Sequence, residues 1–301
     1  MGSIAFFGKM PNAADFVRRG VSTSVMRDFE NWFHSAYTDL RGAGARGLMH
    51  QCHLILPTRN DPSGVISGLA IPSRDRIGRQ FPVVVAAFVP RDHLPRSAAP
   101  LAIAFARFWG EARAAIAEHQ DGEPEALWKA IQSLSPPGAA ELSEAETRCA
   151  ALLQNLGARQ MEQECFSAPD DRFYAYHTLR LAVRDGRDSR VLMCPAAGHP
   201  GYRAFWVAAV ERGTANRLPL PTMWLEGEDA PRGTLVALGK APSAMLRYVT
   251  GLGRQSSSLW PLTTQSAVAQ ERAKATLAGE DWDDAEQKLS RLIDVALGTQ
   301  S

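Results

Sequence analysis

Residues 71–82 read IPSRDRIGRQFP and lead straight into the apolar run VVVAAFV at residues 83–89. The run predicts a strand, and Pro82 suits its first position because proline cannot donate to a ladder of backbone hydrogen bonds. Asp75 suits a turn in which it accepts hydrogen bonds from backbone N–H groups or an arginine, and Gly78 can supply a positive φ. Three readings stay open: a braced turn, an Arg/Asp surface presented to a partner, or a catalytic anion clamp.

Hydrophobic periodicity predicts strands and helices along the rest of the chain. We predict strands at 3–7, 49–56, 65–71, 83–89, 222–225 and 234–238, a turn at 60–64, and a hairpin of residues 172–183 and 190–194 around Asp185-Gly186. We predict helices at 24–41, from Pro100 through Ile116, at 127–134, 141–156, 199–210 and 242–252. Some neighbouring strands look antiparallel while helices interrupt elsewhere, so the pattern predicts a mixed α/β sheet covered by helices on both faces.

Two breaks suggest how the chain is organised. Pro136-Pro137-Gly138 is the clearest one, and residues 256–258 look like a linker. We therefore predict an α/β domain at residues 1–257, with an internal break near 136–138, followed by a linker and a C-terminal amphipathic helix within 258–301. One face of that helix is apolar, with Trp282, Ala285, Leu289, Leu292, Ile293 and Ala296. The helix either packs onto its own domain or pairs with a second copy or a partner.

Composition excludes several classes of protein. The chain has 301 residues and a formal net charge of +1, which argues against a nucleic-acid binder that relies on bulk charge. Its four cysteines form no CxxC pair, which is typical of reduced thiols in a cytosolic protein. We expect no signal peptide and no membrane insertion, because the sequence has neither a leader pattern nor a long uncharged apolar run.

The usual signatures of cofactor, metal and nucleophile sites are incomplete. Gly8-Lys9 and Gly239-Lys240 resemble the end of a phosphate-binding loop, but both lack the earlier glycine and the following hydroxyl residue. His50-Gln51-Cys52-His53 lacks a second pair of zinc ligands, and on a strand Cys52 and His53 point to opposite faces. No GxSxG elbow occurs. We therefore predict no metal, no cofactor and no enzyme activity.

Two long motifs carry a resemblance to a known family. Residues 7–19, FGKMPNAADFVRR, are similar to the pattern F-G-K-x-P-x-x-G-D-F-V-x-R, and residues 72–82, PSRDRIGRQFP, to P-S-x-D-x-x-G-R-x-F-P. On these motifs the chain resembles the TagF/ImpM family of bacterial type VI secretion. A weaker likeness covers residues 221–224 and 239–248, and the tail from about 258 lies outside it. Ala14-Asp15 stands where the family pattern has Gly-Asp.

The resemblance implies a three-layer α/β/α sandwich without catalytic activity. It also implies a cytoplasmic, post-translational negative regulator whose partner is the forkhead-associated-domain protein of the secretion apparatus. Because both motifs are charged, we predict that their charged residues meet the partner: Lys9, Asp15, Arg18, Arg19, Arg74, Asp75, Arg76 and Arg79. Their remaining residues would shape the motifs: Gly8, Pro11, Phe16, Pro72, Gly78, Phe81 and Pro82. The surface hypothesis fails if the charged side chains are mutually paired and buried.

Two other functions stay open at this point. One is an enzyme that uses the arginines of residues 74–79 on a phosphorylated or acyl substrate, which requires a deep pocket beside them. The other is a structural assembly factor that oligomerises through the tail helix. The sequence leaves the oligomeric state open.

Overall fold

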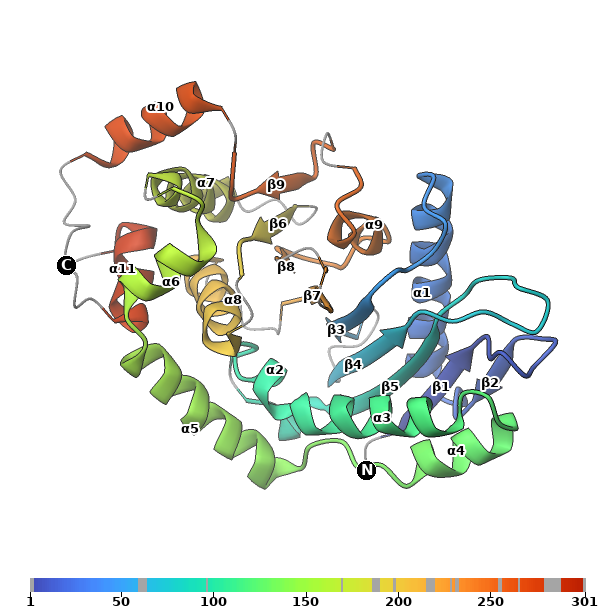
Figure 1. Ribbon diagram of the computed structural model, residues 1–301. Coiled ribbons are helices and arrows are strands. Elements are labelled where there is room, and N and C mark those ends of the chain that lie inside the picture. The colour runs from blue at the N-terminus through green and yellow to red at the C-terminus, as the bar shows by residue number, and fades with distance from the viewer. Residues whose placement is uncertain are drawn as a thin grey trace.

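Strands and helices form a mixed α/β fold (Figure 1). The computed structural model describes residues 3–58, 64–95, 97–168, 170–185, 190–196, 199–214, 220–227, 229–230, 233–253, 256–264, 266–278 and 288–299. The strands are β1 Ile4–Gly8, β2 Val17–Arg19, β3 Gln51–Pro57, β4 Gly64–Ile71, β5 Val83–Pro90, β6 Val191–Cys194, β7 Thr222–Glu226, β8 Thr234–Ala237 and β9 Leu259–Pro261. They form one sheet in the order β2-β1-β5-β4-β3-β7-β8-β6-β9. The β6–β9 pair is parallel and the other described pairs are antiparallel, so the predicted mixed sheet is confirmed.

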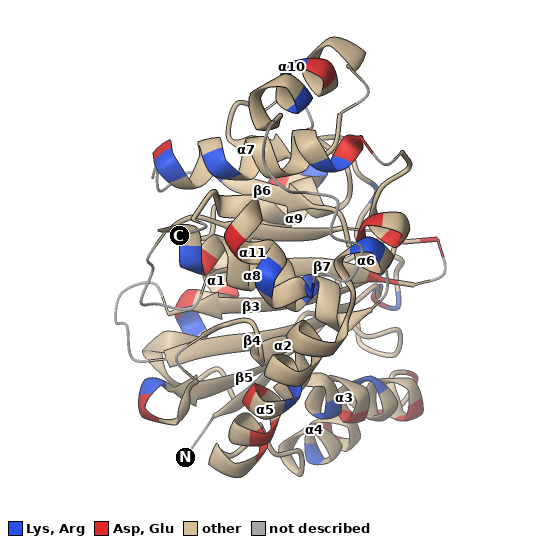
Figure 2. Ribbon diagram, turned by 90° about the vertical axis from the view of Figure 1, so that its left-hand side faces the viewer, with Lys and Arg blue, Asp and Glu red and all other residues tan. Residues whose placement is uncertain are grey.

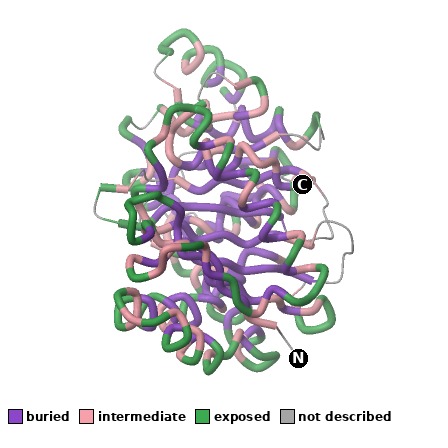
Figure 3. The backbone as a smooth tube through the Cα atoms, turned by 90° about the vertical axis from the view of Figure 1, so that its right-hand side faces the viewer, coloured by how far each residue is buried: buried purple, intermediate pink, exposed green. Residues whose placement is uncertain are grey.

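Helices cover both faces of this sheet, as the three-layer prediction requires. They are α1 Ser24–Gly42, α2 Leu101–Ala104, α3 Ala106–His119, α4 Pro124–Gln132, α5 Ala139–Asn155, α6 Ala158–Cys165, α7 Asp171–Asp185, α8 Pro200–Thr214, α9 Met245–Val249, α10 Ala267–Leu277 and α11 Leu289–Leu297, with a 3₁₀ turn at Arg91–His93. One hydrophobic core lies between the sheet and α1 with α9, and a second lies under the remaining helices. The buried sheet between these layers is visible in Figure 3.

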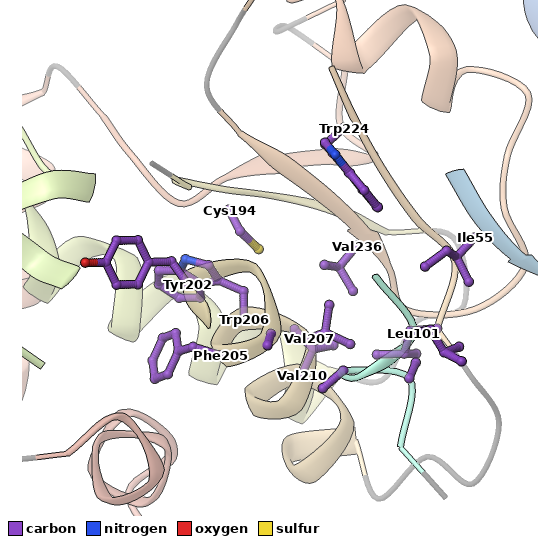
Figure 4. Close-up of a cluster of buried hydrophobic side chains, with 14 of the residues drawn as sticks. Ile55, Leu101, Cys194, Tyr202, Phe205, Trp206, Val207, Val210, Trp224 and Val236 are labelled. Atoms are coloured by element: carbon purple, nitrogen blue, oxygen red, sulfur yellow. The ribbon is translucent and has the colours of Figure 1, made fainter. Parts of the chain in front are cut away.

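The apolar run after the charged turn forms strand β5, whose side chains contribute to both hydrophobic cores. Val83 and Val85 belong to the second core, on the opposite face of the sheet from α1, whereas Val84 and Ala86 belong to the core between the sheet and α1. Successive side chains of a strand point to opposite faces, so an unbroken apolar run suits a strand that is covered on both sides. Each helix contributes one apolar stripe instead; in Figure 4, Val207 and Val210 of α8 lie beside Val236 of β8.

The predicted hairpin at residues 172–183 is wrong, because this segment is helix α7. Phe173, Tyr176 and Leu179 are buried and lie three residues apart, a spacing that places neighbours on the same side of a helix and not on one face of a strand. The second half of the predicted hairpin, residues 190–194, does form a strand, β6, which pairs with β8. The predicted helix at 242–252 is confirmed only over the five residues of α9.

The tail after residue 257 lies against the rest of the chain where the structure describes it. Strand β9 extends the sheet beside β6, α10 packs on α7, and α11 packs on α8, α7 and α5. Arg180 of α7 donates hydrogen bonds to the carbonyl oxygens of Val295 and Ala296 at the end of α11. The division at residue 257 stays a prediction. Residues 60–63 of the predicted turn at 60–64, and Trp282 and Ala285 of the predicted tail helix, lie outside the described residues.

We predict that Leu292→Ala lowers the free energy of unfolding by about 3 kcal/mol, because truncating a buried leucine leaves a cavity. Leu292 is buried in α11 against the second core, whereas its neighbour Arg291 is exposed. Urea denaturation measures the loss, with Arg291→Ala as the matched control that stays within about 0.5 kcal/mol of the wild type. Equal stability of both variants would contradict packing of α11 onto its own chain.

Candidate interaction surface

The two sequence motifs meet at the ends of two neighbouring strands, where β1 ends and β5 begins. Phe7 pairs with Val84, so the chain leaves β1 at Gly8 directly beside Pro82. Gly8 has a φ of 140°, and a Cβ atom at this position would lie 2.1 Å from the carbonyl oxygen of Pro82. A residue with a side chain cannot occupy such a place without moving the backbone. The glycine of the first motif is therefore fixed by the proline of the second.

Asp75 is the centre of the turn formed by residues 72–82. Its side chain is fully buried, and its Oδ2 accepts hydrogen bonds from Lys9 Nζ at 2.7 Å and from Arg79 Nε at 2.6 Å. Its Oδ1 accepts from the backbone N–H groups of Ile77 at 3.1 Å and of Arg79 at 2.8 Å. We call Lys9, Asp75 and Arg79 the brace. The brace joins the two motifs through a buried charge that has two cationic partners.

Burial acts to raise the pKa of the Asp75 carboxyl, but hydrogen bonds from Lys9 and Arg79 outweigh it and hold the pKa well below its usual range. The carboxylate therefore stays ionised at neutral pH.

The rest of the turn is shaped by glycine and aromatic residues. Gly78 has a φ of 87° and donates its N–H to the carbonyl oxygen of Asp75 at 2.9 Å. Phe81 packs against Phe16 of the first motif, with ring centroids 5.2 Å apart, and against Tyr37 of α1 at 4.6 Å. Pro11, Pro72 and Pro82 line a cavity of about 300 Å³ between the motifs. The residues predicted to shape the motifs thus lie where they can do so.

The charged residues of the motifs fall into two groups. Lys9, Asp75 and Arg79 make up the brace, and Arg79 also donates to the carbonyl oxygen of Ala14 at 2.6 Å. The other paired residues are Arg18, 2.8 Å from the carboxylate of Glu30 on α1, and Arg19, 3.5 Å from Glu125 on α4.

Asp15, Arg74 and Arg76 form the second group. They are exposed, and none of their side chains has an ion pair or hydrogen bond among the described residues.

Two apolar residues that were not predicted from the sequence, Met49 and Ile77, are exposed beside these charged residues. The side chains of Met49 and Ile77 are 71% and 66% exposed, which is unusual for residues of their size. Met49 lines the small cavity together with Arg74, and Ile77 follows Arg76 in the turn. The sequence does contain a hint of Ile77, because it is an apolar residue within the polar turn of residues 72–82. We call Asp15, Met49, Arg74, Arg76 and Ile77 the motif surface.

Neither a metal site nor a membrane segment is found in the described part of the chain. No group of three or more His, Cys, Asp or Glu side chains is placed to hold a metal ion there. Cys52 faces the core under α1, while His53 lies on the other face against Trp109 and Trp224, as the strand pattern predicted. None of the described helices has the length and apolar character needed to cross a membrane.

Comparison with known proteins identifies the N-terminal part of the chain. Residues 5–134 match the model of the TagF N-terminal domain, which is described as type VI secretion system-associated. The match includes both motifs, and it confirms the resemblance read from them. No curated protein matches the chain. The crystal structure of PA0076 from Pseudomonas aeruginosa PAO1 is similar at a TM-score of 0.48 and 17% identity, over 84% of this chain and 96% of that chain.

We predict that Gly8→Ala destabilises the protein by on the order of 3 kcal/mol, because the new Cβ meets the Pro82 carbonyl and the φ is strained. Gly42, at the end of α1, is the matched control, since a Cβ there meets nothing within 4 Å. Gly42→Ala should change stability by less than about 1 kcal/mol. Thermal and urea unfolding of the two variants make the comparison, and similar losses would refute the close approach of the motifs.

We predict that Asp75→Asn lowers the urea midpoint at pH 7, because it leaves Lys9 and Arg79 without their anionic partner. The folded-state pKa of Asp75 lies below its unfolded value, so its contribution is fully present above the unfolded pKa, about 4, and is lost as pH falls toward the folded pKa. The difference between wild type and variant should therefore be constant from pH 7 to 5 and shrink below 4. Asp15→Asn, at an exposed carboxylate, is the control and should show no such difference.

Proposed function

Because residues 5–134 belong to the TagF N-terminal domain family, we propose that this chain is a cytoplasmic, non-enzymatic regulator of type VI secretion. It acts after translation by binding the forkhead-associated-domain protein of the apparatus and repressing secretion. The motif surface makes the contact. The observation that carries the proposal is the division of the motif charges, in which the brace uses Lys9, Asp75 and Arg79 and leaves Arg74 and Arg76 exposed.

The composition of the motif surface supports docking to a protein. Interfaces combine apolar or aromatic anchors with arginine at a polar rim. Here Met49 and Ile77 supply exposed apolar area, and Arg74 and Arg76 supply cationic groups without an intramolecular partner among the described residues. Such exposed charges steer an acidic partner and set its orientation more than they add affinity. The brace would keep the turn rigid, so that little ordering entropy is lost on binding.

The two other readings have less support. An enzyme acting through these arginines would need an adjacent general base, and Asp75 is a poor one because four donors hold it as an anion. An assembly factor that pairs through the tail would need a free apolar helix face. The apolar residues of α11 that are described, Leu292 and Ile293 among them, are buried against their own chain.

We predict that calorimetric titration with the forkhead-associated-domain protein of the type VI secretion apparatus from the same organism gives a dissociation constant of micromolar or tighter. The double variant Arg74→Glu/Arg76→Glu should weaken binding by about 10- to 100-fold, because two steering charges are reversed. Ile77→Ser should weaken it by about 10-fold through loss of apolar contact. All three positions are exposed, so circular dichroism should show folded variants with unchanged melting temperatures.

Arg291→Glu is the matched control for charge reversal, because Arg291 is exposed on α11, outside the matched domain. Its binding should equal that of the wild type. No binding by the wild type would refute the proposed partner. Binding that survives the changes at Arg74, Arg76 and Ile77 would refute the motif surface while leaving the partner in place.

A further inference from the structure

A second, larger cavity lies on the other side of the sheet from α1, and the motifs do not contribute to it. Its volume is about 1030 Å³, and its walls come from α3, α5, the first turn of α8 and the adjoining ends of β3 and β7. Figure 2 shows lysine and arginine side by side with acidic residues on α3 and α5, the two helices that flank it. A cavity of this size is large enough for a small molecule of nucleotide size.

The floor of the cavity is a rigid stack of rings. The His53 ring lies parallel to Trp224, with centroids 5.2 Å apart, and the Arg203 guanidinium lies on Trp224 at 4.1 Å from the ring centre. Trp109 meets His53 edge-on at 4.8 Å. His53 Nε2 lies 2.5 Å from Glu226 Oε2, which Gln51 Nε2 also contacts at 2.9 Å. Burial lowers the pKa of His53, which favours the neutral ring, and its Nε2 faces the Glu226 carboxylate.

Three arginines on the cavity wall have no carboxylate partner within ion-pair distance in the described part of the chain: Arg113, Arg148 and Arg203. Arg203 is partly buried and makes one hydrogen bond, from Nε to Thr234 Oγ1 at 3.3 Å. Burial lowers the pKa of its guanidinium to about 10, so the group is still charged at pH 7. Arg203 and Arg113 both act electrostatically on His53 and Glu226, so they flank the same pair.

Four carboxylates also line the cavity, and among the described residues only Glu141 is paired with an arginine. Glu226 is held by His53 and Gln51, and Glu141 accepts from Arg107 and from the N–H of Gly138, where it caps α5. Glu164 accepts from Gln160. Glu144 is exposed and has no contact with an arginine within ion-pair distance among the described residues. Arg113, Arg148 and Arg203 thus line the cavity together with the carboxylates Glu144, Glu164 and Glu226, and no ion pair joins the two sets among the described residues.

Two ring nitrogens at the floor also lack partners. Trp109 Nε1 and His53 Nδ1 are buried, and neither has a hydrogen-bond partner among the described residues. Their side chains are each 5% exposed, and both residues line the cavity. Buried polar atoms are normally satisfied, and leaving one without a partner costs about 1–3 kcal/mol. Because these nitrogens have almost no accessible surface, a bound molecule reaches them only if a side chain of the cavity floor moves.

We propose that this cavity binds a small phosphate monoester. Arg203 and Arg113 hold the phosphate oxygens, because a guanidinium matches phosphate geometry with two parallel donors. The organic part of the molecule lies against the apolar wall formed by Ile103, Ala145 and Leu152. Trp224 and His53 keep Arg203 in place before the ligand arrives, since its guanidinium rests on a ring that is itself stacked.

Calorimetric titration of the full chain with AMP and with adenosine tests the proposal. The wild type should bind AMP with a dissociation constant below about 1 mM and should give no heat with adenosine, which lacks the phosphate. Arg113→Gln and Arg203→Met should each weaken AMP binding by at least about 10-fold, since each removes one charge-assisted contact. Arg113 is exposed and has no described partner, so its variant should fold as the wild type does. Arg291→Gln, outside the cavity, should bind as the wild type.

Three results would overturn the proposal. The first is the absence of AMP binding by the wild type at up to about 10 mM, where a dissociation constant of 1 mM would be saturating. The second is AMP binding that is unchanged in both Arg113→Gln and Arg203→Met. The third is equal heat from adenosine and AMP, which would place recognition on the base and ribose instead of the phosphate.

Discussion

The buried carboxylate of Asp75 joins Lys9, which follows β1, to Arg79 in the turn before β5. The arrangement of the two sequence motifs depends on this interaction. A charge in such a place is tolerated only when it is paired and hydrogen-bonded. Lys9 and Arg79 supply the pairing, and two backbone N–H groups of the turn complete the set. Removing either cation would leave the Asp75 carboxylate with an incomplete set of partners, so the geometry of each motif depends on the other. This accounts for a lysine and an aspartate that lie 66 residues apart in the chain but belong to one arrangement.

The same pairing decides which charges of the motifs remain for other uses. From the sequence, the arginines at 74, 76 and 79 look equivalent, because all three flank Asp75 in one short turn. In the fold, Arg79 donates to Asp75 and to the carbonyl oxygen of Ala14. Arg74 and Arg76 are exposed, and their side chains make no ion pair or hydrogen bond among the described residues. The turn therefore contains both kinds of residue: Asp75 and Arg79 belong to the brace, whereas Arg74 and Arg76 are exposed.

Sequence patterns predict the parts of this fold whose residues repeat with a clear period. The helix at 24–41 and the strands at 65–71 and 83–89 agree with α1, β4 and β5 to within a residue or two, because long apolar stripes and runs identify them. Strands β2 and β9 were missed, since three residues have no period and are defined only by the strand they pair with. Helix α7 was misread because its aromatic residues also suit a strand, and only packing decides between the two periods.

The candidate sites can also be predicted from the sequence only where their residues lie in one recognisable motif. The brace could be anticipated in part, since Asp75 and Gly78 have turn chemistry and the motifs are long enough to be recognised. The large cavity could not, because its rings and arginines come from β3, α3, α8 and β7, and only the sheet order brings them together. Trp224 lies in one of the weakly similar segments, but one tryptophan in a strand predicts core packing as readily as a binding site.

An arginine without a partner has a different meaning in the two places. Arg74 and Arg76 are exposed to water, where the dielectric constant is high and a single charge contributes little energy to a complex. Their value lies in long-range attraction and orientation, which suits transient docking of a protein surface. Arg203 is partly buried over Trp224, where fewer water molecules screen its charge and the lowered pKa records the cost. A partly desolvated cation gains much more from an anion than an exposed one does. The proposed phosphate site and the proposed docking surface therefore rest on different uses of an arginine charge, short-range pairing in the cavity and long-range steering at the exposed turn.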